Sequence, residues 1–392
     1  MREDWPKVKL GEVLRFTPRP VKVEADRTYR EIGIRSHGRG IFHKLPVTGA
    51  EIGNKRVFGV EPGDFVLNIV FAWEGAVALA TASEAGMIGS HRFPTFRPDP
   101  TRLDPRYLLY LFRTEFGLTL LGRVSPGGAG RNRTLNRLVF LGQEIPLPAL
   151  VDQRRLAIRI EELCASINDA RTLRNLAREE AEDLLICMAH RRDLSEAVKQ
   201  SASWQRIRLG ECIRLVDDSH RVAVGRHYPN LGIYSFGRGL FHKPPIDAAS
   251  TSAVSLRRVK AGQFIYSRLF AFEGAYGIVT IEYDGHFVSG EYPTFECDPG
   301  VIRAEFLGAY FKARSVWREV AIGSKGLGHR RQRVQPQQVL NHSLWIPPLA
   351  WQDRLAETQV AVEALKRRQA RTATELDALL PAILDRAFRG EL

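Results

Sequence analysis

Short apolar runs separated by turn-forming residues fill two long stretches of the chain. In 1–150 and 201–349, runs such as DFVLNIVF (64–71) and QFIYSRLF (263–270) lie between glycines, prolines and polar residues. Apolar runs bounded in this way are typical of short strands. One short helical stretch follows the strands in each region, at 105–116 and 304–317. The pattern therefore predicts two mixed domains with short strands and few helices.

Two other segments, 152–191 and 352–389, have a different pattern. Glycine and proline are almost absent there, and apolar residues recur every three or four positions. This spacing predicts an amphipathic helix with a narrow apolar seam. About 35–40 residues at ~1.5 Å each make a rod of roughly 55 Å. Such a seam needs a partner helix, either the other rod or an unrelated helix. Pro381 lies inside the second rod and is expected to kink or divide it. The predicted seam comprises Leu156, Ile160, Leu163, Ile167, Ala170, Leu173, Leu176, Leu184 and Leu185, and then Leu355, Val362, Leu365, Leu376, Leu379 and Ile383.

The two stretches are copies of one unit. YREIGIRSHGRGIFHK (29–44) and YPNLGIYSFGRGLFHK (228–243) are identical at ten of sixteen positions, at an offset of 199. FAWEGA (71–76) and FAFEGA (270–275) align at the same offset, as do LVDQRRLA (150–157) and LAWQDRLA (349–356). A period this long indicates a duplicated domain and not a solenoid.

The repeat divides the chain into a first domain at 1–150, a helix at 151–200, a second domain at 201–349 and a second helix at 350–392. The predicted fold class is α+β: two similar mixed domains joined by two long helices. We expect the helices to pack as an antiparallel coiled coil, in a pseudo-twofold arrangement.

The positive charge of the chain lies in the two domains. The 392 residues include 57 Lys and Arg against 44 Asp and Glu, a net charge of +13. Residues 1–150 carry 22 basic and 15 acidic side chains, and 201–349 carry 19 and 12, so each domain has +7. The helical segments carry −1 and zero. A basic surface confined to particular domains suggests a polyanionic ligand, most simply nucleic acid, with solubility alone as the alternative.

Cysteine usage and hydropathy place further limits on the class of protein. The four cysteines are far apart and form no CxxC pair. This argues against a disulfide scaffold and a cysteine zinc site, and it fits a reducing cytoplasm. There is no apolar run long enough for a transmembrane helix and no apolar segment typical of a signal peptide at the N-terminus.

The repeated GRG loop is the first candidate site. Arg39 and Arg238 lie between glycines, which permit positive φ and close approach of a ligand. An arginine there can bind guanine O6 and N7, or a phosphate, through two donors. The alternative is an ordinary hairpin turn with a solvated arginine. The basic residues that follow each loop are His43, Lys44, His242 and Lys243.

A second loop, at 125–136 and 323–334, combines glycines with arginines. We call these two segments the Gly-Arg loops. A DNA backbone is the natural counterpart for such charge, although a basic loop without a ligand is the alternative. The GK[ST] ending of a P-loop is missing. The arginines concerned are Arg131, Arg133, Arg330, Arg331 and Arg333.

The FAWEGA and FAFEGA segments place Glu74 and Glu273 between an aromatic residue and a glycine. A glutamate can accept a hydrogen bond from cytosine N4, but pairing with a neighbouring arginine is the preferred interpretation. Trp73 and Phe272 are expected in the core and not in base stacking.

Positions that differ in chemistry between the copies are candidates for different base preferences. The differing pairs are Arg35 and Tyr234, His37 and Phe236, Ile69 and Arg268, and Arg92 and Glu291. The candidate DNA contacts are therefore Arg35, His37, Arg39, His43, Lys44, Arg131, Arg133, Tyr234, Arg238, His242, Lys243, Arg268, Arg330, Arg331 and Arg333.

The order of these motifs resembles the specificity (S) subunit of type I restriction–modification systems, over essentially the whole chain. The most specific parts are the IPLPALVDQRR junction at 145–155 and the C-terminal segment ending in AFRGEL. The second junction, IPPLAWQDRLA, departs from the pattern at Trp351 and Asp353, which we interpret as drift at the start of a helix.

The resemblance implies a non-catalytic subunit with two target-recognition domains, each reading one half of a bipartite site in double-stranded DNA. It implies two methyltransferase (M) subunits and restriction/translocase (R) subunits as partners. S-adenosylmethionine, ATP and Mg²⁺ would then belong to those partners, with no cofactor on this chain. The sequence contains no GxSxG, HExxH, GxGxxG after a strand, or methyltransferase or helicase motif. The remaining alternatives are an unrecognised nuclease and an adaptor that binds RNA or acidic protein.

Overall fold

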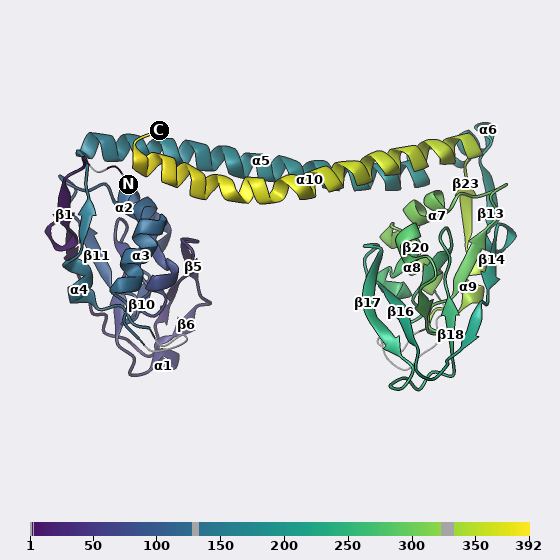
Figure 1. Ribbon diagram of the computed structural model, residues 1–392, viewed down its shortest axis with the longest axis horizontal. Coiled ribbons are helices and arrows are strands. Elements are labelled where there is room, and N and C mark those ends of the chain that lie inside the picture. Colours follow the sequence, from purple (N-terminus) through teal and green to yellow (C-terminus); the bar gives the residue numbers. More distant parts are fainter. Residues whose placement is uncertain (1, 3, 128–132, 323–332) are drawn as a thin grey trace. The chain divides into compact units, whose positions relative to one another are not determined.

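The computed structural model describes residues 2, 4–127, 133–322 and 333–392. The chain forms two compact units, one comprising Met1–Thr172 with Arg371–Leu392 and the other Leu173–Ala370 (Figure 1). Both boundaries fall within the long helices α5 (Leu150–His190) and α10 (Leu349–Arg389). Each unit therefore contains one copy of the repeat together with part of both helices.

The first unit is built around a four-stranded antiparallel sheet. Its strand order is β2 (Leu14–Phe16), β11 (Thr95–Pro98), β8 (Phe65–Leu67) and β9 (Val77–Leu79). Two-stranded pairs surround it: β1 (Lys7–Lys9) with β12 (Glu144–Pro146), β3 (Thr28–Tyr29) with β6 (Val47–Thr48), β4 (Ile32–Ile34) with β5 (Ile41–His43), and β7 (Val57–Gly59) with β10 (Ile88–Ser90).

The second unit contains the corresponding sheets, one of them enlarged. Its four-stranded sheet has the order β14 (Ile213–Val216), β22 (Thr294–Cys297), β19 (Phe264–Tyr266) and β20 (Tyr276–Ile278). A five-stranded sheet has the order β15 (Ser219–Arg221), β18 (Ser255–Arg258), β21 (Phe287–Val288), β16 (His227–Ile233) and β17 (Leu240–Asp247). The remaining pair is β13 (Gln205–Arg208) with β23 (Ser343–Ile346).

Corresponding strands pair in the same register in the two units. Lys7 lies opposite Pro146 in the first copy, and Arg206 lies opposite Trp345 in the second. Arg206 and Trp345 are the residues 199 positions after Lys7 and Pro146. The duplication seen in the sequence is therefore a duplication of strand pairing.

Each copy has two short helices where the sequence pattern predicted one. α2 (Pro105–Leu111) and α3 (Glu115–Arg123) correspond to α7 (Ala304–Tyr310) and α8 (Arg314–Ala321). The prediction of single stretches at 105–116 and 304–317 is wrong because a new helix begins after a break. In the first copy Thr114 caps that new helix by accepting a hydrogen bond from the Gly117 amide at 3.2 Å. The other short helices are α1 (Gly49–Ile52), α4 (Arg137–Leu141), α6 (Glu196–Ser201) and α9 (Pro336–Asn341).

A buried glutamine attaches each copy to the start of a long helix. In the first copy, Gln153 accepts a hydrogen bond from the Asp104 amide at 2.9 Å and donates to two backbone carbonyls. Gln352 accepts from the Arg303 amide at 2.7 Å and likewise donates to two carbonyls. Both side chains are fully buried. The glutamine of the repeated helix start therefore fixes the strand-rich part of each copy on its helix, because all its polar atoms are satisfied there.

The long helices pack against each other in antiparallel orientation within each unit (Figure 1). In the first unit Arg171 pairs with Asp377 at 2.6 Å, and Leu156 and Phe388 belong to one buried cluster. In the second unit Lys366 pairs with Glu182 at 2.9 Å. Trp351 there donates to the carbonyl of Met188 at 3.1 Å, so that later positions of α5 meet earlier positions of α10. The predicted coiled-coil partnership of the two rods is confirmed.

The predicted seam is only partly buried. Leu156, Ile160, Ile167 and Leu185 are buried on α5, and Leu355 and Val362 are buried on α10. Two helices that pack side by side cover one narrow stripe of each, so other apolar positions stay on the outside. Pro381 lies within α10, and the helix is not divided there. The predicted seam residues that are exposed are Leu173, Leu176, Leu184, Leu365 and Leu379.

Phenylalanine and tyrosine rings dominate the core of each copy. Phe65, Phe96, Phe112 and Phe140 are fully buried in the first unit and pack with ring centroids 5.6–5.8 Å apart. These rings join the four-stranded sheet to the short helices on one side of it. No helix in the described part of the chain has the length and apolar character needed to cross a membrane.

Candidate nucleic-acid interface

The GRG loop of the first copy is the tip of a β-hairpin. It joins β4 to β5 and closes with a hydrogen bond from the Arg35 amide to the Gly40 carbonyl at 3.0 Å. Gly38 and Gly40 both have positive φ, as the glycine spacing predicted. Arg39 lies between them, exposed and without an ion-pair partner among the described residues. The loop is therefore a hairpin turn, and the arginine at its tip is exposed.

The FAWEGA turn is hydrogen-bonded to this hairpin. The amides of His37 and Gly38 donate to the carbonyls of Glu74 and Gly75 at 2.8 and 2.9 Å. The Ser36 hydroxyl donates to the Glu74 carboxylate at 2.7 Å. Gly75 has a φ of 76°, a left-handed conformation that favours glycine at this position.

The second copy repeats the same link between its two motifs. Phe236 and Gly237 donate to the carbonyls of Glu273 and Gly274 at 2.7 and 3.0 Å. Ser235 donates to the Glu273 carboxylate at 3.0 Å. Pairing of Glu74 and Glu273 with arginines was the preferred sequence interpretation; among the described residues their carboxylates instead accept hydrogen bonds from Ser36 and Ser235.

The side chains at the two hairpin tips differ although the backbone is the same. In the first copy the Arg35 guanidinium lies 4.8 Å from the Phe42 ring centroid, and His37 is exposed beside it. In the second copy Tyr234 stacks on Phe241 with ring centroids 4.2 Å apart. Arg238 lies 4.8 Å from the Tyr234 centroid and donates to the Ser235 carbonyl at 3.0 Å.

The basic residues that follow each hairpin are engaged within their own unit. His43 lies 2.6 Å from the buried Glu84, and His242 lies 2.8 Å from Glu282. Burial opposes ionisation of Glu84, but hydrogen bonds from His43 and Thr81 outweigh it and hold the pKa of that carboxyl below its usual value.

Lys44 lies 3.3 Å from Glu31, whereas Lys243 has no ion-pair partner in the described ranges. Of the four predicted DNA contacts His43, Lys44, His242 and Lys243, only Lys243 lacks a carboxylate partner within the described ranges.

The described ends of the Gly-Arg loops lie against the same region. Arg133 lies 5.0 Å from the Trp73 ring centroid, and the Leu135 amide donates to the Ile69 carbonyl at 2.8 Å. Trp73 and Phe272 are both half-buried and do not belong to the core. The prediction that they lie in the core is therefore wrong. The FAWEGA turn therefore contacts both the GRG hairpin and the Gly-Arg loop of its copy.

In the second copy Arg333 pairs with Glu291 at 3.1 Å, and Arg268 donates to Gln335 at 2.7 Å. Glu291 lies 3.9 Å from Arg268 as well. The matched Ile69 of the first copy packs against its hydrophobic core. The predicted contacts Arg131, Arg330 and Arg331 lie outside the described residues.

In the first copy the structure thus brings three repeated motifs together, which sequence spacing alone did not predict. In the second copy it joins the GRG hairpin to the FAFEGA turn, and the described end of the Gly-Arg loop contacts Arg268 and Glu291. Ser36 and Ser235 were missed as members of the site. Their identity in both copies, between flanking positions that differ, was the available signal. The site contains exposed arginines and aromatic rings on backbone fixed by hydrogen bonds, an arrangement suited to binding a polyanion.

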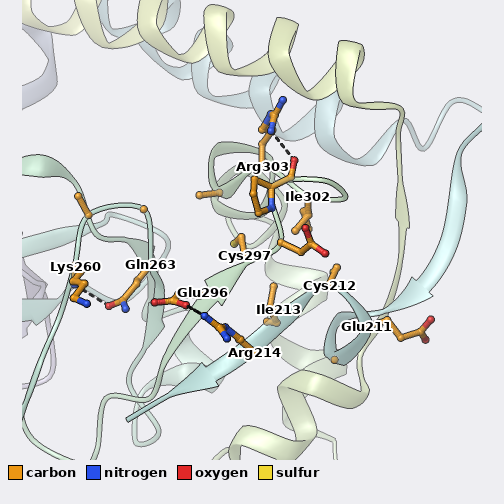
Figure 2. A pocket seen from close by; sticks show the side chains of 16 residues that line it. Glu211, Cys212, Ile213, Arg214, Lys260, Gln263, Glu296, Cys297, Ile302 and Arg303 are labelled. Carbon is orange, nitrogen blue, oxygen red and sulfur yellow. Dashed lines mark hydrogen bonds and ion pairs between the residues drawn. The ribbon is translucent and has the colours of Figure 1, made fainter. Parts of the chain in front are cut away.

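A separate groove of about 780 Å³ lies in the second unit (Figure 2). Figure 2 shows Arg214 beside Glu296, to which it donates a hydrogen bond at 3.1 Å. It also shows Lys260 beside Gln263, whose side-chain oxygen accepts a hydrogen bond from the Lys260 backbone amide at 2.8 Å. Burial raises the pKa of the Cys212 thiol, which also lines the groove, to about 12. No predicted DNA contact lines this groove, so it is distinct from the candidate interface. The described residues contain no cluster of His, Cys, Asp and Glu able to hold a metal ion.

No protein-family model matches the chain, and no curated protein matches it. Among solved structures it is similar to the HsdS subunit from Thermoanaerobacter tengcongensis, with a TM-score of 0.58 and 22% identity over 100% of this chain and 98% of that one. It is also similar to a chain from a study of complex assembly and conformational transition of the type I R-M system, with a TM-score of 0.66 and 21% identity over 100% of this chain and 99% of that one. The chain therefore has the fold of the HsdS subunit, which confirms the fold that the sequence resemblance implied.

Proposed function

We propose that this chain is the DNA-specificity subunit of a type I restriction–modification complex. In this proposal each copy of the repeat reads one half of a bipartite target in double-stranded DNA. The observation that carries the proposal is the hydrogen-bonded junction of the GRG hairpin with the FAWEGA or FAFEGA turn in both copies, with Arg133 of the Gly-Arg loop beside Trp73 in the first. Each copy also carries a charge of +7, which favours DNA because lysine and arginine displace its condensed counterions.

The long helices would bind the catalytic partners. Leu173, Leu176 and Leu184 are 47–66% exposed on α5, and Leu365 and Leu379 are exposed on α10. Apolar side chains exposed on a near-neutral helix pair suit a protein surface better than a nucleic acid. We propose two methyltransferase subunits and restriction/translocase subunits as these partners, in the cytoplasm.

The chain itself would be non-catalytic and without a cofactor. S-adenosylmethionine, ATP and Mg²⁺ would be bound by the partner subunits, which would carry out adenine methylation or restriction. The arginine-rich site supports this division of labour because it offers hydrogen-bond donors and charge for binding.

The target is expected to be an interrupted, imperfect inverted repeat. Two similar domains related by an approximate twofold axis read similar half-sites on opposite strands. The half-site centres would lie roughly one helical turn, about 34–36 Å, apart.

Methylation mapping tests the proposal. The chain is co-expressed with methyltransferase subunits encoded beside it, and genomic methylation is compared with that of cells lacking this chain alone. We expect adenine methylation at one bipartite motif only when the chain is present. A motif that persists without the chain, cleavage of DNA by the purified chain, or a preference for RNA over duplex DNA would contradict the proposal.

A further inference from the structure

The two GRG hairpins carry different chemistry on one backbone, and the difference is largest at His37 and Phe236. These residues occupy matched positions, with φ of 60° and 66°. Only two other non-glycine residues in the described part of the chain, Arg191 and Ser203, have positive φ. The left-handed conformation is rarely adopted by bulky residues because Cβ approaches the following carbonyl oxygen.

The Phe236 ring gains little from the fold in return for this strain. Phe236 is 57% exposed at the tip of the hairpin. Its recorded ring contact is with the Arg238 guanidinium, 5.9 Å away. Glycine at this position would adopt the same φ without strain, so stability alone does not explain a phenylalanine there.

Two hydrogen bonds to Glu273 hold the backbone that carries the ring. The Phe236 amide donates to the Glu273 carbonyl at 2.7 Å, and Ser235 donates to the Glu273 carboxylate at 3.0 Å. Beside it, Tyr234 stacks on Phe241 and lies under Arg238. The second hairpin thus presents the rings of Tyr234 and Phe236 beside Arg238, whereas the first presents the hydrogen-bond donors Arg35 and His37 beside the matched Arg39.

Resting on the proposed function, we infer that Phe236 is a specificity-determining residue that contacts the C5-methyl group of a thymine in the half-site read by the second copy. In the major groove, thymine is the base that offers an apolar group, and phenylalanine is among the side chains that contact it. The first hairpin, with donors at the matched positions, has no corresponding preference for a methyl group. The exchange of His37 for Phe236 on the same loop backbone therefore makes the two half-sites differ at this base.

The test uses the assembled complex with its methyltransferase subunits and a synthetic duplex containing the mapped target. Each thymine of the second half-site is replaced in turn by deoxyuridine, which lacks only the methyl group. One replacement is expected to weaken wild-type binding about fourfold, the change expected for losing one buried methyl group. Phe236→Gly should weaken binding of the thymine duplex and abolish the response to deoxyuridine.

Two controls separate this role from a structural one. Phe236→Gly should leave the thermal stability of the complex unchanged or raised, because it relieves the positive φ. His37→Gly should leave the response of the second half-site intact. If wild-type complex binds its target specifically but no deoxyuridine replacement weakens binding, or if Phe236→Gly keeps the response, the inference is overturned while the proposed function stands. If Phe236→Gly instead weakens binding of the methyltransferase subunits, the ring contacts protein and the inference is wrong. Absence of any sequence-specific target would overturn the proposed function itself.

Discussion

The Ser36 hydroxyl donates a 2.7 Å hydrogen bond to the Glu74 carboxylate and so joins two motifs that are 38 positions apart. The same bond joins Ser235 to Glu273 in the second copy. Glu74 and Glu273 therefore position the hairpins, and their carboxylates are already engaged. The conformation of each hairpin therefore depends on the FAWEGA or FAFEGA turn of its own copy.

Ser36→Ala is expected to weaken DNA binding through the first half-site. Hydrogen bonds to charged groups contribute roughly 1.5–3 kcal/mol, so the loop should lose a substantial restraint. Competition binding with targets altered in one half at a time measures the effect. Ser235→Ala should affect the second half in the same way, and Ser83→Ala, at an exposed position, should affect neither. Equal weakening of both halves by Ser36→Ala would contradict a local role.

Arg39→Ala should reduce the salt dependence of DNA binding. The side chain is exposed at the hairpin tip, and a lost phosphate contact lowers the slope of log K against log salt by about one unit. Binding titrations over a range of salt concentrations give the slope. Arg354→Ala removes the same charge from an exposed position on α10 and should leave the slope unchanged. An unchanged slope for Arg39→Ala would place this hairpin away from the phosphates.

Acid should destabilise the second unit through two buried histidines. His190 lies 3.0 Å from the Tyr310 carbonyl, and the Tyr310 hydroxyl lies 2.9 Å from His342. Burial lowers the pKa of both histidines to about 4. The unfolded chain takes up protons near pH 6.5 and the folded chain does not, so stability is full above that pH and falls as pH decreases toward 4.

Between pH 7.5 and pH 5 the loss should be about 2 kcal/mol per histidine. Urea unfolding at the two pH values measures it. His342→Gln, which introduces the residue found at the matched position 143, should remove about half of the pH dependence. Identical pH dependence in this variant and in the wild type would show that His342 does not titrate on unfolding.

Burial predicts which leucines of α5 hold the helix pair together. Leu185 is fully buried, whereas Leu173 is 66% exposed. Leu185→Asp should destabilise the second unit by several kcal/mol, because an unpaired charge would be buried, and Leu173→Asp should change stability by less than about 0.5 kcal/mol. Chemical denaturation followed by circular dichroism distinguishes the two. A comparable loss in both variants would mean that the buried stripe is broader than the structure indicates.

The elements with strong periodicity were predictable from the sequence, and the contacts between motifs were not. The 199-residue offset and the long helices follow from local pattern, and α5 and α10 end within a few residues of the expected positions. The exposure of Leu173 and Leu365 depends on which stripe the partner helix covers, and this is a tertiary property. The bond between Ser36 and Glu74 joins segments whose separation in sequence gives no indication of proximity. The positive φ of Phe236 depends on the loop path, although the flanking glycines indicated a sharp turn.

The central claim is that each copy of the repeat reads its own half of the DNA target. The most direct measurement is methylation mapping with a chain in which residues 200–348 are replaced by a second copy of 1–149, joined to the unchanged helices and assembled with the same methyltransferase subunits. The account predicts a perfect inverted repeat, with both halves equal to the half that the first copy reads in the natural chain. A motif that keeps the second natural half, or that has two unrelated halves, would contradict the account.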